Sequence, residues 1–298
     1  MGKMFDALQK VEREKYDVPE EDAPKTTPDD IILDDKLVSF FQPSSMVAEQ
    51  FKRLRTHIIR PGLENSAKTI LVTSTVAGEG KSLIAVNLAI TIATELHSHA
   101  LLVDCDLRNP SLSRMFGLQE KKGLSNYLRG EAEIPDLLIK TSVDKLTVFS
   151  GGSLQENPVE LIGSNRMKSL VKDLKSRYDD RYIIIDSSPL LATTEPSVLN
   201  EMVDGIILVI KSGETPRESV HQAIKLLKKE KILGVVLNSL EFKTQAMIRR
   251  YFGTHRYYYD YRYSKAHPEL SKWQKVASLA GDMKAFVTKL KPGKKEEQ

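Results

Sequence analysis

The stretch TSTVAGEGKS (73–82) has the residue types and spacing of a phosphate-binding loop. The spacing G-x-x-x-x-G-K-[ST] ends at Gly80, Lys81 and Ser82, with Thr75 in place of the first glycine. The glycines permit positive φ, so successive backbone N–H groups can surround phosphate oxygens at the start of a helix. Lys81 is then placed to reach the terminal phosphates and Ser82 to hold Mg²⁺. We expect nucleotide contacts from Ala77, Gly78, Glu79, Gly80, Lys81, Ser82 and Leu83.

Three carboxylates end two other apolar runs. In LLVDCDLRNP (101–110), extended backbone directs Asp104 and Asp106 to one side and Cys105 to the other, where a small buried residue is expected. YIIIDSSP ends its apolar run at Asp186, the position of a Walker B aspartate that contacts Mg²⁺ directly or through water. Ligands of parallel sheets bind at the carboxyl edge, and paired carboxylates there suit metal coordination and proton abstraction.

A cluster of phenols lies near the end of the chain. Six of the ten tyrosines fall within residues 251–263, separated mainly by arginines and one aspartate. A core strand would alternate its aromatic residues with apolar ones, and this stretch does not. The cluster is therefore either a set of modified side chains or an aromatic interaction loop, and it comprises Tyr251, Tyr257, Tyr258, Tyr259, Tyr261 and Tyr263.

The elements that must position these residues follow an alternating pattern. Short, continuous Val-, Ile- and Leu-rich runs predict strands that are buried on both faces, at 68–74, 100–104, 145–150, 181–186, 205–210 and 233–238. Helical patterns occur at 45–59, 81–96, 158–176, 195–203 and 216–230. This alternation predicts an α/β fold with a doubly wound, mainly parallel sheet and helices on both faces, of the P-loop NTPase type.

The segments around this pattern divide the chain into three parts. Residues 1–40 combine a short amphipathic helix with a Pro- and acid-rich linker, and the helix packs on its own domain, binds a partner or frays. Residues 41–245 form the P-loop domain. Residues 246–298 contain the tyrosine cluster and a helical tail, with an amphipathic pattern at 269–290.

The composition excludes several classes of protein. A net charge of +4 does not argue for nucleic acid, and one cysteine excludes an internal disulfide framework. The beginning of the chain lacks the apolar region of a secretory signal, and no apolar run approaches 18 residues. We expect a cytoplasmic protein whose membrane role, if it has one, comes through a partner.

Together these features resemble the bacterial tyrosine kinases of capsule and exopolysaccharide synthesis. TSTVAGEGKS resembles their Walker A motif, LLVDCDLRNPSLSRMFG their Walker A′ motif, and IIIDSSP their Walker B motif, with Ser187-Ser188 where Thr-Pro is usual. The tyrosine cluster adds to the resemblance, which covers roughly residues 40–263. The opening MFDALQKVEREK is similar to members that are made as separate cytosolic chains.

The resemblance implies roles for the matching residues. ATP and Mg²⁺ are the implied cofactors, and Lys81, Asp104, Asp106 and Asp186 are the implied catalytic residues. Ser82, Asp106 and Asp186 hold the metal, and Asp104 is the favoured base toward the tyrosine hydroxyl, although the roles of Asp104 and Asp106 stay exchangeable at this point. Asn238 is similar to an adenine-binding residue of related ATPases, its alternative being a strand-end turn residue.

The resemblance also implies partners. EQFKRLRT (49–56) is similar to the E-x-x-R-x-x-R helix through which such kinases form rings, here with Glu49, Lys52 and Arg55, where lysine replaces the first arginine. Implied partners are a membrane activator of the chain-length-determinant type, which holds the kinase at the inner membrane, and a cognate tyrosine phosphatase. The clustered tyrosines are then the kinase's own substrates, phosphorylated in trans within a ring.

Two alternative functions compete with this interpretation. One is a positioning or partitioning ATPase like MinD or ParA, but those enzymes carry a signature lysine where this chain has Val76. The other is a non-catalytic nucleotide-binding scaffold of a polysaccharide export complex, which would not need an intact set of one lysine and three aspartates. Detection of phosphotyrosine after incubation with ATP discriminates among the three.

Overall fold

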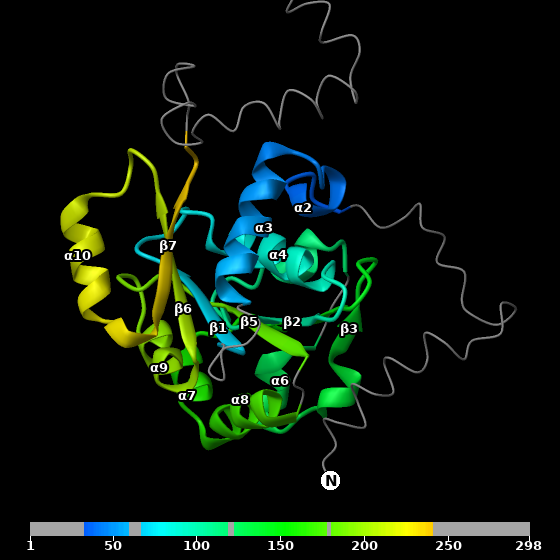
Figure 1. Ribbon diagram of the computed structural model, residues 1–298. Coiled ribbons are helices and arrows are strands. Elements are labelled where there is room, and N and C mark those ends of the chain that lie inside the picture. The colour runs from blue at the N-terminus through cyan, green and yellow to red at the C-terminus, as the bar shows by residue number, and fades with distance from the viewer. Residues whose placement is uncertain (1–32, 60–66, 119–121, 178–179, 241–298) are drawn as a thin grey trace, which may run out of the picture. The chain divides into compact units, whose positions relative to one another are not determined.

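A seven-stranded sheet runs through the part of the chain that the computed structural model describes, residues 33–59, 67–118, 122–177 and 180–240 (Figure 1). Its strand order is β3-β4-β2-β5-β1-β6-β7, and every neighbouring pair is parallel except β3 and β4. The prediction of a mainly parallel α/β sheet is confirmed. The strands are β1 (Thr69–Ser74), β2 (His99–Asp104), β3 (Leu138–Lys140), β4 (Leu146–Phe149), β5 (Arg181–Asp186), β6 (Gly205–Lys211) and β7 (Ile232–Asn238).

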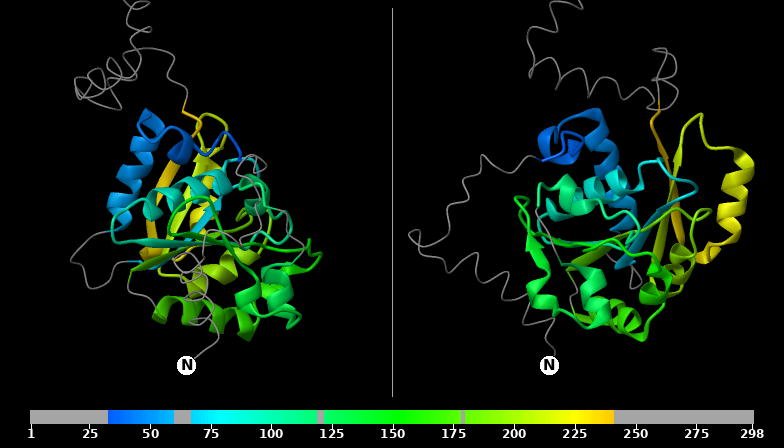
Figure 2. Two further views of the ribbon diagram at one scale, coloured as in Figure 1. Left: turned by 90° about the vertical axis from the view of Figure 1, so that its right-hand side faces the viewer. Right: turned by 180° about the vertical axis from the view of Figure 1, so that it is seen from behind.

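Helices cover both faces of this sheet (Figure 2). The α-helices are α2 (Val38–Phe41), α3 (Met46–Ile58), α4 (Lys81–Ala93), α5 (Leu112–Met115), α6 (Leu124–Arg129), α7 (Pro158–Ile162), α8 (Asn165–Arg177), α9 (Glu195–Met202) and α10 (Arg217–Lys225). Two short 3₁₀ helices are η2 (Ile134–Asp136) and η3 (Lys229–Lys231). None of the helices in these described ranges is long and apolar enough to cross a bilayer.

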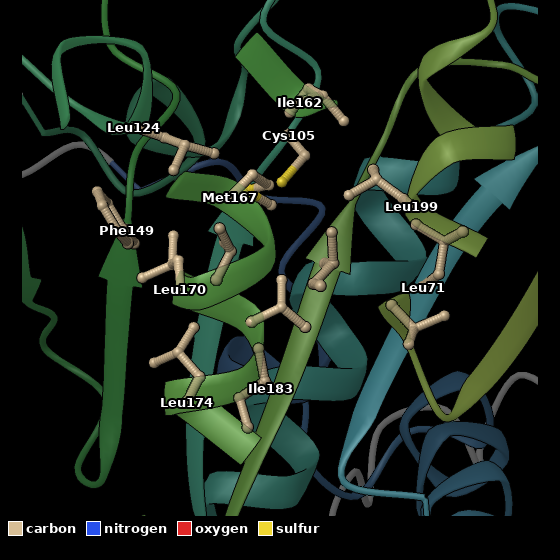
Figure 3. Close-up of a cluster of buried hydrophobic side chains, with 14 of the residues drawn as sticks. Leu71, Cys105, Leu124, Phe149, Ile162, Met167, Leu170, Leu174, Ile183 and Leu199 are labelled. Atoms are coloured by element: carbon tan, nitrogen blue, oxygen red, sulfur yellow. The ribbon is translucent and has the colours of Figure 1, made fainter. Parts of the chain in front are cut away.

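Two hydrophobic cores hold the layers together, one on each face of the sheet. The central strand β5 contributes to both, because Ile183 and Ile185 face one core while Tyr182 and Ile184 face the other. Figure 3 shows leucines of α8 and the Met167 side chain packed over this strand. Full burial of one such aliphatic side chain contributes about 1.5–3 kcal/mol, so these layers rigidly define the sheet edge that carries the predicted site.

The structure differs from the predicted elements in three places. The helix predicted at 158–176 is two helices, because α7 ends at Gly163 and the Ser164 hydroxyl accepts a hydrogen bond from Met167 N (3.2 Å), which starts α8. The helix predicted at 216–230 stops at Lys225. The short antiparallel strand β3 was not predicted, since three residues carry almost no periodicity.

Several sequence-based predictions lie outside the described residues. These are the amino-terminal helix, most of the linker, the tyrosine cluster and the tail helix. The division into residues 1–40, 41–245 and 246–298 therefore stays a prediction.

Candidate active site

The predicted site residues meet at the carboxyl edge of the central strands. β5 lies between β1 and β2, so the loop that follows β1 adjoins the last residues of β2 and β5. Asp104 and Asp186 are direct partners in the β2–β5 register. Topology thus brings the phosphate-binding loop and the aspartates together, as the sequence predicted.

The loop between β1 and α4 has the backbone that the glycine pattern predicted. Gly78 (φ 83°) and Gly80 (φ 89°) both adopt left-handed conformations. The left-handed φ favours glycine at Gly80, and a Cβ atom added there would lie only 2.2 Å from Asn238 Nδ2, so the Asn238 side chain would have to move. The loop leads directly into α4, whose first N–H groups have no intrahelical partners and can bind an anion.

Lys81 holds the acidic residues together in the nucleotide-free chain. Its Nζ lies 2.7 Å from Asp106 Oδ2 and 3.8 Å from Asp186 Oδ1, and it donates to Ser82 Oγ at 3.2 Å. Burial by itself would lower the pKa of Lys81, but the charges of Asp186 and Asp106 raise it above its ordinary value. The ammonium group is therefore firmly charged and paired with carboxylates.

Asp104 is fully buried and held by backbone donors. Its Oδ2 accepts hydrogen bonds from Ser111 N (2.9 Å) and Leu112 N (3.1 Å), and its Oδ1 accepts one from Asp106 N (3.2 Å). Burial and the nearby charge of Asp186 nevertheless raise the pKa of Asp104 to about 7. A carboxylate with a pKa near neutrality suits proton abstraction at physiological pH.

Asp186 is also fully buried, but it lacks the set of backbone N–H donors that holds Asp104. Neither of its carboxylate oxygens has a well-aligned hydrogen bond in the part of the chain that the structure describes. Burial raises the pKa of Asp186 to about 6, although the Lys81 charge and the nearby Ser82 hydroxyl and Ser187 N–H oppose this shift. A buried carboxylate without well-aligned donors is the environment that a cation would complete.

The residues present fit a bound Mg²⁺. Asp106, Asp186 and the Ser82 hydroxyl supply hard oxygen donors, which magnesium prefers together with water and phosphate oxygens. Within the described ranges, no group of three or more His, Cys, Asp or Glu side chains forms a metal cluster.

A second ion pair beside the site was not predicted. Arg108, next to the acidic motif, donates through Nε (3.0 Å) and Nη2 (2.8 Å) to Oε1 of Glu195, whose side chain is buried at the start of α9. The two residues are 87 positions apart, so no local pattern could indicate the pair. It ties the loop after β2 to the segment after β5, which are the two sources of the aspartates. Cys105 is buried, as expected.

The helix motif predicted for ring formation makes contacts within the chain. Lys52 Nζ lies 2.7 Å from Glu49 Oε1, one turn apart on α3. Arg55 Nη1 donates to Thr91 O (2.9 Å) near the end of α4, where the helix dipole favours a cation. Arg55 thus joins α3 to the nucleotide-binding helix. The six predicted phosphorylation sites lie outside the described residues.

Asn238 reaches the phosphate-binding loop. Its Nδ2 donates to Glu79 O at 2.8 Å, so the end of β7 contacts the loop that follows β1. Its side-chain oxygen remains available to a ligand, and its predicted adenine contact stays a prediction.

A family model and several known proteins are similar to this chain. The family model described as ParA, NUBPL iron-transfer P-loop NTPase, matches residues 65–258. The tyrosine-protein kinase YwqD of Bacillus subtilis (strain 168) is 32% identical over 220 residues, covering 73% of this chain and 91% of the relative. The putative tyrosine-protein kinase CapB of Staphylococcus aureus is 32% identical over 214 residues, covering 71% of this chain and 92% of that protein.

Two solved structures are also similar to this chain. The chimerical protein CapA2B2 superposes with a TM-score of 0.64 and 31% identity, covering 70% of this chain and 91% of the other. The kinase domain of the Escherichia coli tyrosine kinase ETK superposes with a TM-score of 0.62 and 25% identity, covering 70% and 83%.

Proposed function

The chain belongs to the bacterial tyrosine-protein kinases, which have a P-loop NTPase fold, and we propose that it uses ATP to phosphorylate its own carboxyl-terminal tyrosines in trans. In this proposal the reaction regulates the polymerisation and export of a capsular or exopolysaccharide. The observation that carries it is the cluster of Lys81, Asp104, Asp106 and Asp186 at the end of β1, β2 and β5. This cluster places a phosphate-binding cation beside carboxylates that can hold a metal and accept a proton.

The first step in the proposed mechanism is an exchange of partners. The triphosphate binds to the N–H groups of the loop and to the start of α4, and Lys81 turns from Asp106 toward the terminal phosphates. Asp106 and Asp186 thereby become available to Mg²⁺, with the Ser82 hydroxyl. Mg²⁺ held by these residues would neutralise charge that develops on the phosphates.

The second step concerns the tyrosine hydroxyl, which is a weak nucleophile with a pKa near 10. We propose that Asp104 accepts the proton of the tyrosine hydroxyl. Its raised pKa of about 7 suits a general base, whereas Asp106 is paired with Lys81 or with the metal. Asp104 is fully buried, so binding of nucleotide and tyrosine must rearrange the cluster before the hydroxyl reaches it. Most of the rate enhancement comes from positioning and charge neutralisation.

The tyrosine segment has the charge of a substrate for this site. Between residues 249 and 265 it carries four arginines and one lysine against one aspartate, a formal charge of +4. A basic segment is attracted to an edge that carries three aspartates and nucleotide phosphates. Each phosphate added to tyrosine contributes about −1.5 to −2, so docking weakens stepwise as phosphorylation proceeds.

Mixing two variants tests the reaction and its direction. An inactive Lys81→Met protein that keeps all six tyrosines is incubated with an active kinase whose six tyrosines are phenylalanine. Phosphotyrosine on the inactive protein is the expected result. The matched control replaces the active kinase with its own Lys81→Met variant. If the wild-type chain labels itself but never the inactive partner, phosphorylation is in cis and the trans proposal fails.

The partners in this proposal are a ring of identical chains, a membrane activator of the chain-length-determinant type and a cognate tyrosine phosphatase. Glu49, Lys52 and Arg55 on α3 are the proposed ring contacts, and in the single chain each of the three side chains is half-buried. Through the activator, the kinase works in the cytoplasm beside the inner membrane. Equal kinase activity with and without the cytosolic segments of such membrane proteins would argue against an activator.

A further inference from the structure

The phosphate-binding loop contains a buried acid that the mechanism above does not use. The Glu79 side chain is only 2% exposed, although it lies within a loop that must receive a polyanion. Its sequence position predicts a backbone contact to nucleotide and says nothing about the carboxylate. A negative charge at this place opposes phosphate binding, so its contacts require an explanation.

Hydrogen bonds from two segments hold the Glu79 carboxylate. Oε2 accepts from Val76 N (2.9 Å), which belongs to the same loop. Oε1 accepts from the Thr215 hydroxyl, in the loop that follows β6, and from Lys211 N (3.4 Å) at the end of β6. Thr215 Oγ1 in turn accepts from Lys211 N at 3.0 Å. The carboxylate therefore joins the loop after β1 to the loop after β6.

The connection continues to the end of β7 and back. Ser212 N donates to Asn238 O (2.9 Å), and Asn238 Nδ2 donates to the backbone oxygen of Glu79 (2.8 Å). A closed circuit of hydrogen bonds thus links the phosphate-binding loop with the carboxyl ends of two neighbouring strands. Both the side chain and the carbonyl of Glu79 take part in it.

The strand order tells which part of the nucleotide this circuit faces. β5 and β2, which carry the aspartates and therefore adjoin the terminal phosphate, lie on one side of β1. β6 and β7 lie on the other side. The nucleoside must extend toward that second side, so the loop after β6 is placed to form its wall.

We propose that Glu79 and Thr215 are positioning residues that keep the phosphate-binding loop in its nucleotide-receiving shape before ATP arrives. The hydrogen bonds of the buried carboxylate order the phosphate-binding loop in the free chain. ATP binding therefore does not have to supply the free energy needed to order the loop. Preorganisation of the free state affects nucleotide affinity, whereas it leaves the chemical step unchanged once ATP is bound.

The experiment compares four single variants of the full-length chain, and it depends on the nucleotide binding proposed above. Thr215→Val removes the hydroxyl with little change of shape, and Glu79→Gln replaces one acceptor with a donor that faces other donors. Thr215→Ser keeps the hydroxyl. Glu214→Gln is the matched control, because Glu214 is the exposed neighbour of Thr215 and its carboxylate forms a 2.8 Å ion pair with Lys211 Nζ at the surface.

Two quantities are measured for each variant: the Kd for a fluorescent ATP analogue, and the KM and kcat of autophosphorylation. We expect Thr215→Val and Glu79→Gln to raise Kd and KM about tenfold or more, the effect of losing a hydrogen bond to a charged group. Their kcat should stay within about twofold, and Thr215→Ser and Glu214→Gln should match the wild-type chain. The double variant Glu79→Gln/Thr215→Val should bind the ATP analogue no more weakly than Glu79→Gln alone, because both substitutions break the same hydrogen bond between Glu79 and Thr215.

Specific outcomes overturn the inference. An unchanged Kd in Thr215→Val refutes it, and so does a lower kcat with an unchanged KM, which is what a smaller folded fraction produces. If Glu79→Gln does not fold, Thr215→Val with its serine counterpart still decides the question. A wild-type chain that binds no nucleotide refutes the proposed function itself, and this result is distinct from variants that bind as well as wild type.

Discussion

Asp186 offers a test in which stability and function change in opposite directions. Its carboxylate is fully buried, has no well-aligned hydrogen bond within the described chain, and lies 3.8 Å from the Lys81 ammonium. Asparagine has nearly the same shape and carries no charge. We predict that Asp186→Asn stabilises the nucleotide-free chain while it abolishes kinase activity through loss of the metal ligand.

The pKa of Asp186 gives the size of the effect. The difference between the ordinary value of 3.8 and about 6 corresponds to about 3 kcal/mol of folding free energy, as an upper estimate. Because the folded-state pKa is raised, the stability associated with the protonated group is fully present below pH 3.8 and is lost as the pH rises through about 6. The gain from Asp186→Asn should therefore be complete at pH 8 and roughly half as large at pH 5.

Thermal unfolding of the metal-free and nucleotide-free chain at pH 5 and pH 8 measures this gain. At pH 8 the melting temperature should rise by about 6–12 °C, given about 2–4 °C per kcal/mol for a domain of this size. Asp106→Asn is the matched control. It also removes one acidic charge, but it breaks a 2.7 Å ion pair with Lys81, so we expect no comparable gain.

Asp186→Asn that is no more stable than the wild-type chain at pH 8 would refute this prediction. So would a gain in stability that does not depend on pH. Either result would mean that the carboxylate is satisfied in the nucleotide-free chain. Addition of Mg²⁺ and ADP provides a further check, because these ligands should stabilise the wild type and have less effect on the variant.

Three further predictions concern the phosphate-binding loop and the tyrosines. Lys81→Met should abolish autophosphorylation in a folded protein, since loss of a phosphate-binding cation costs orders of magnitude in rate, and full phosphotyrosine signal from folded Lys81→Met would end the kinase interpretation. Gly80→Ala should abolish nucleotide binding, because its Cβ would lie 2.2 Å from Asn238 Nδ2 at a φ of 89°; near-normal binding in a titration with fluorescent nucleotide would contradict this. Assembly size, measured by light scattering, should fall gradually as more of the six tyrosines are left available for phosphorylation, and loss through one particular tyrosine would refute a graded switch.

The amino-acid sequence by itself was sufficient for the local parts of the site. The left-handed glycines, the start of α4 at Lys81 and the aspartates that end β2 and β5 each depend on a few adjacent residues. The alternation of apolar runs likewise predicted the parallel sheet, because buried strands and amphipathic helices have different periods. The break between α7 and α8 was missed, at a Gly-Ser pair inside an otherwise helical pattern, and so were the short strand β3 and the end of α10 at Lys225.

The tertiary structure alone decided which distant side chains meet. Arg108 and Glu195 are 87 positions apart, and Glu79 and Thr215 are 136 apart. These pairs depend on the order of strands in the sheet, which follows from the packing of whole layers. The residues next to each partner in the sequence do not indicate that order. The same packing buries the aspartates, so it also raises the pKa values of Asp104 and Asp186, which their neighbours in sequence could not indicate.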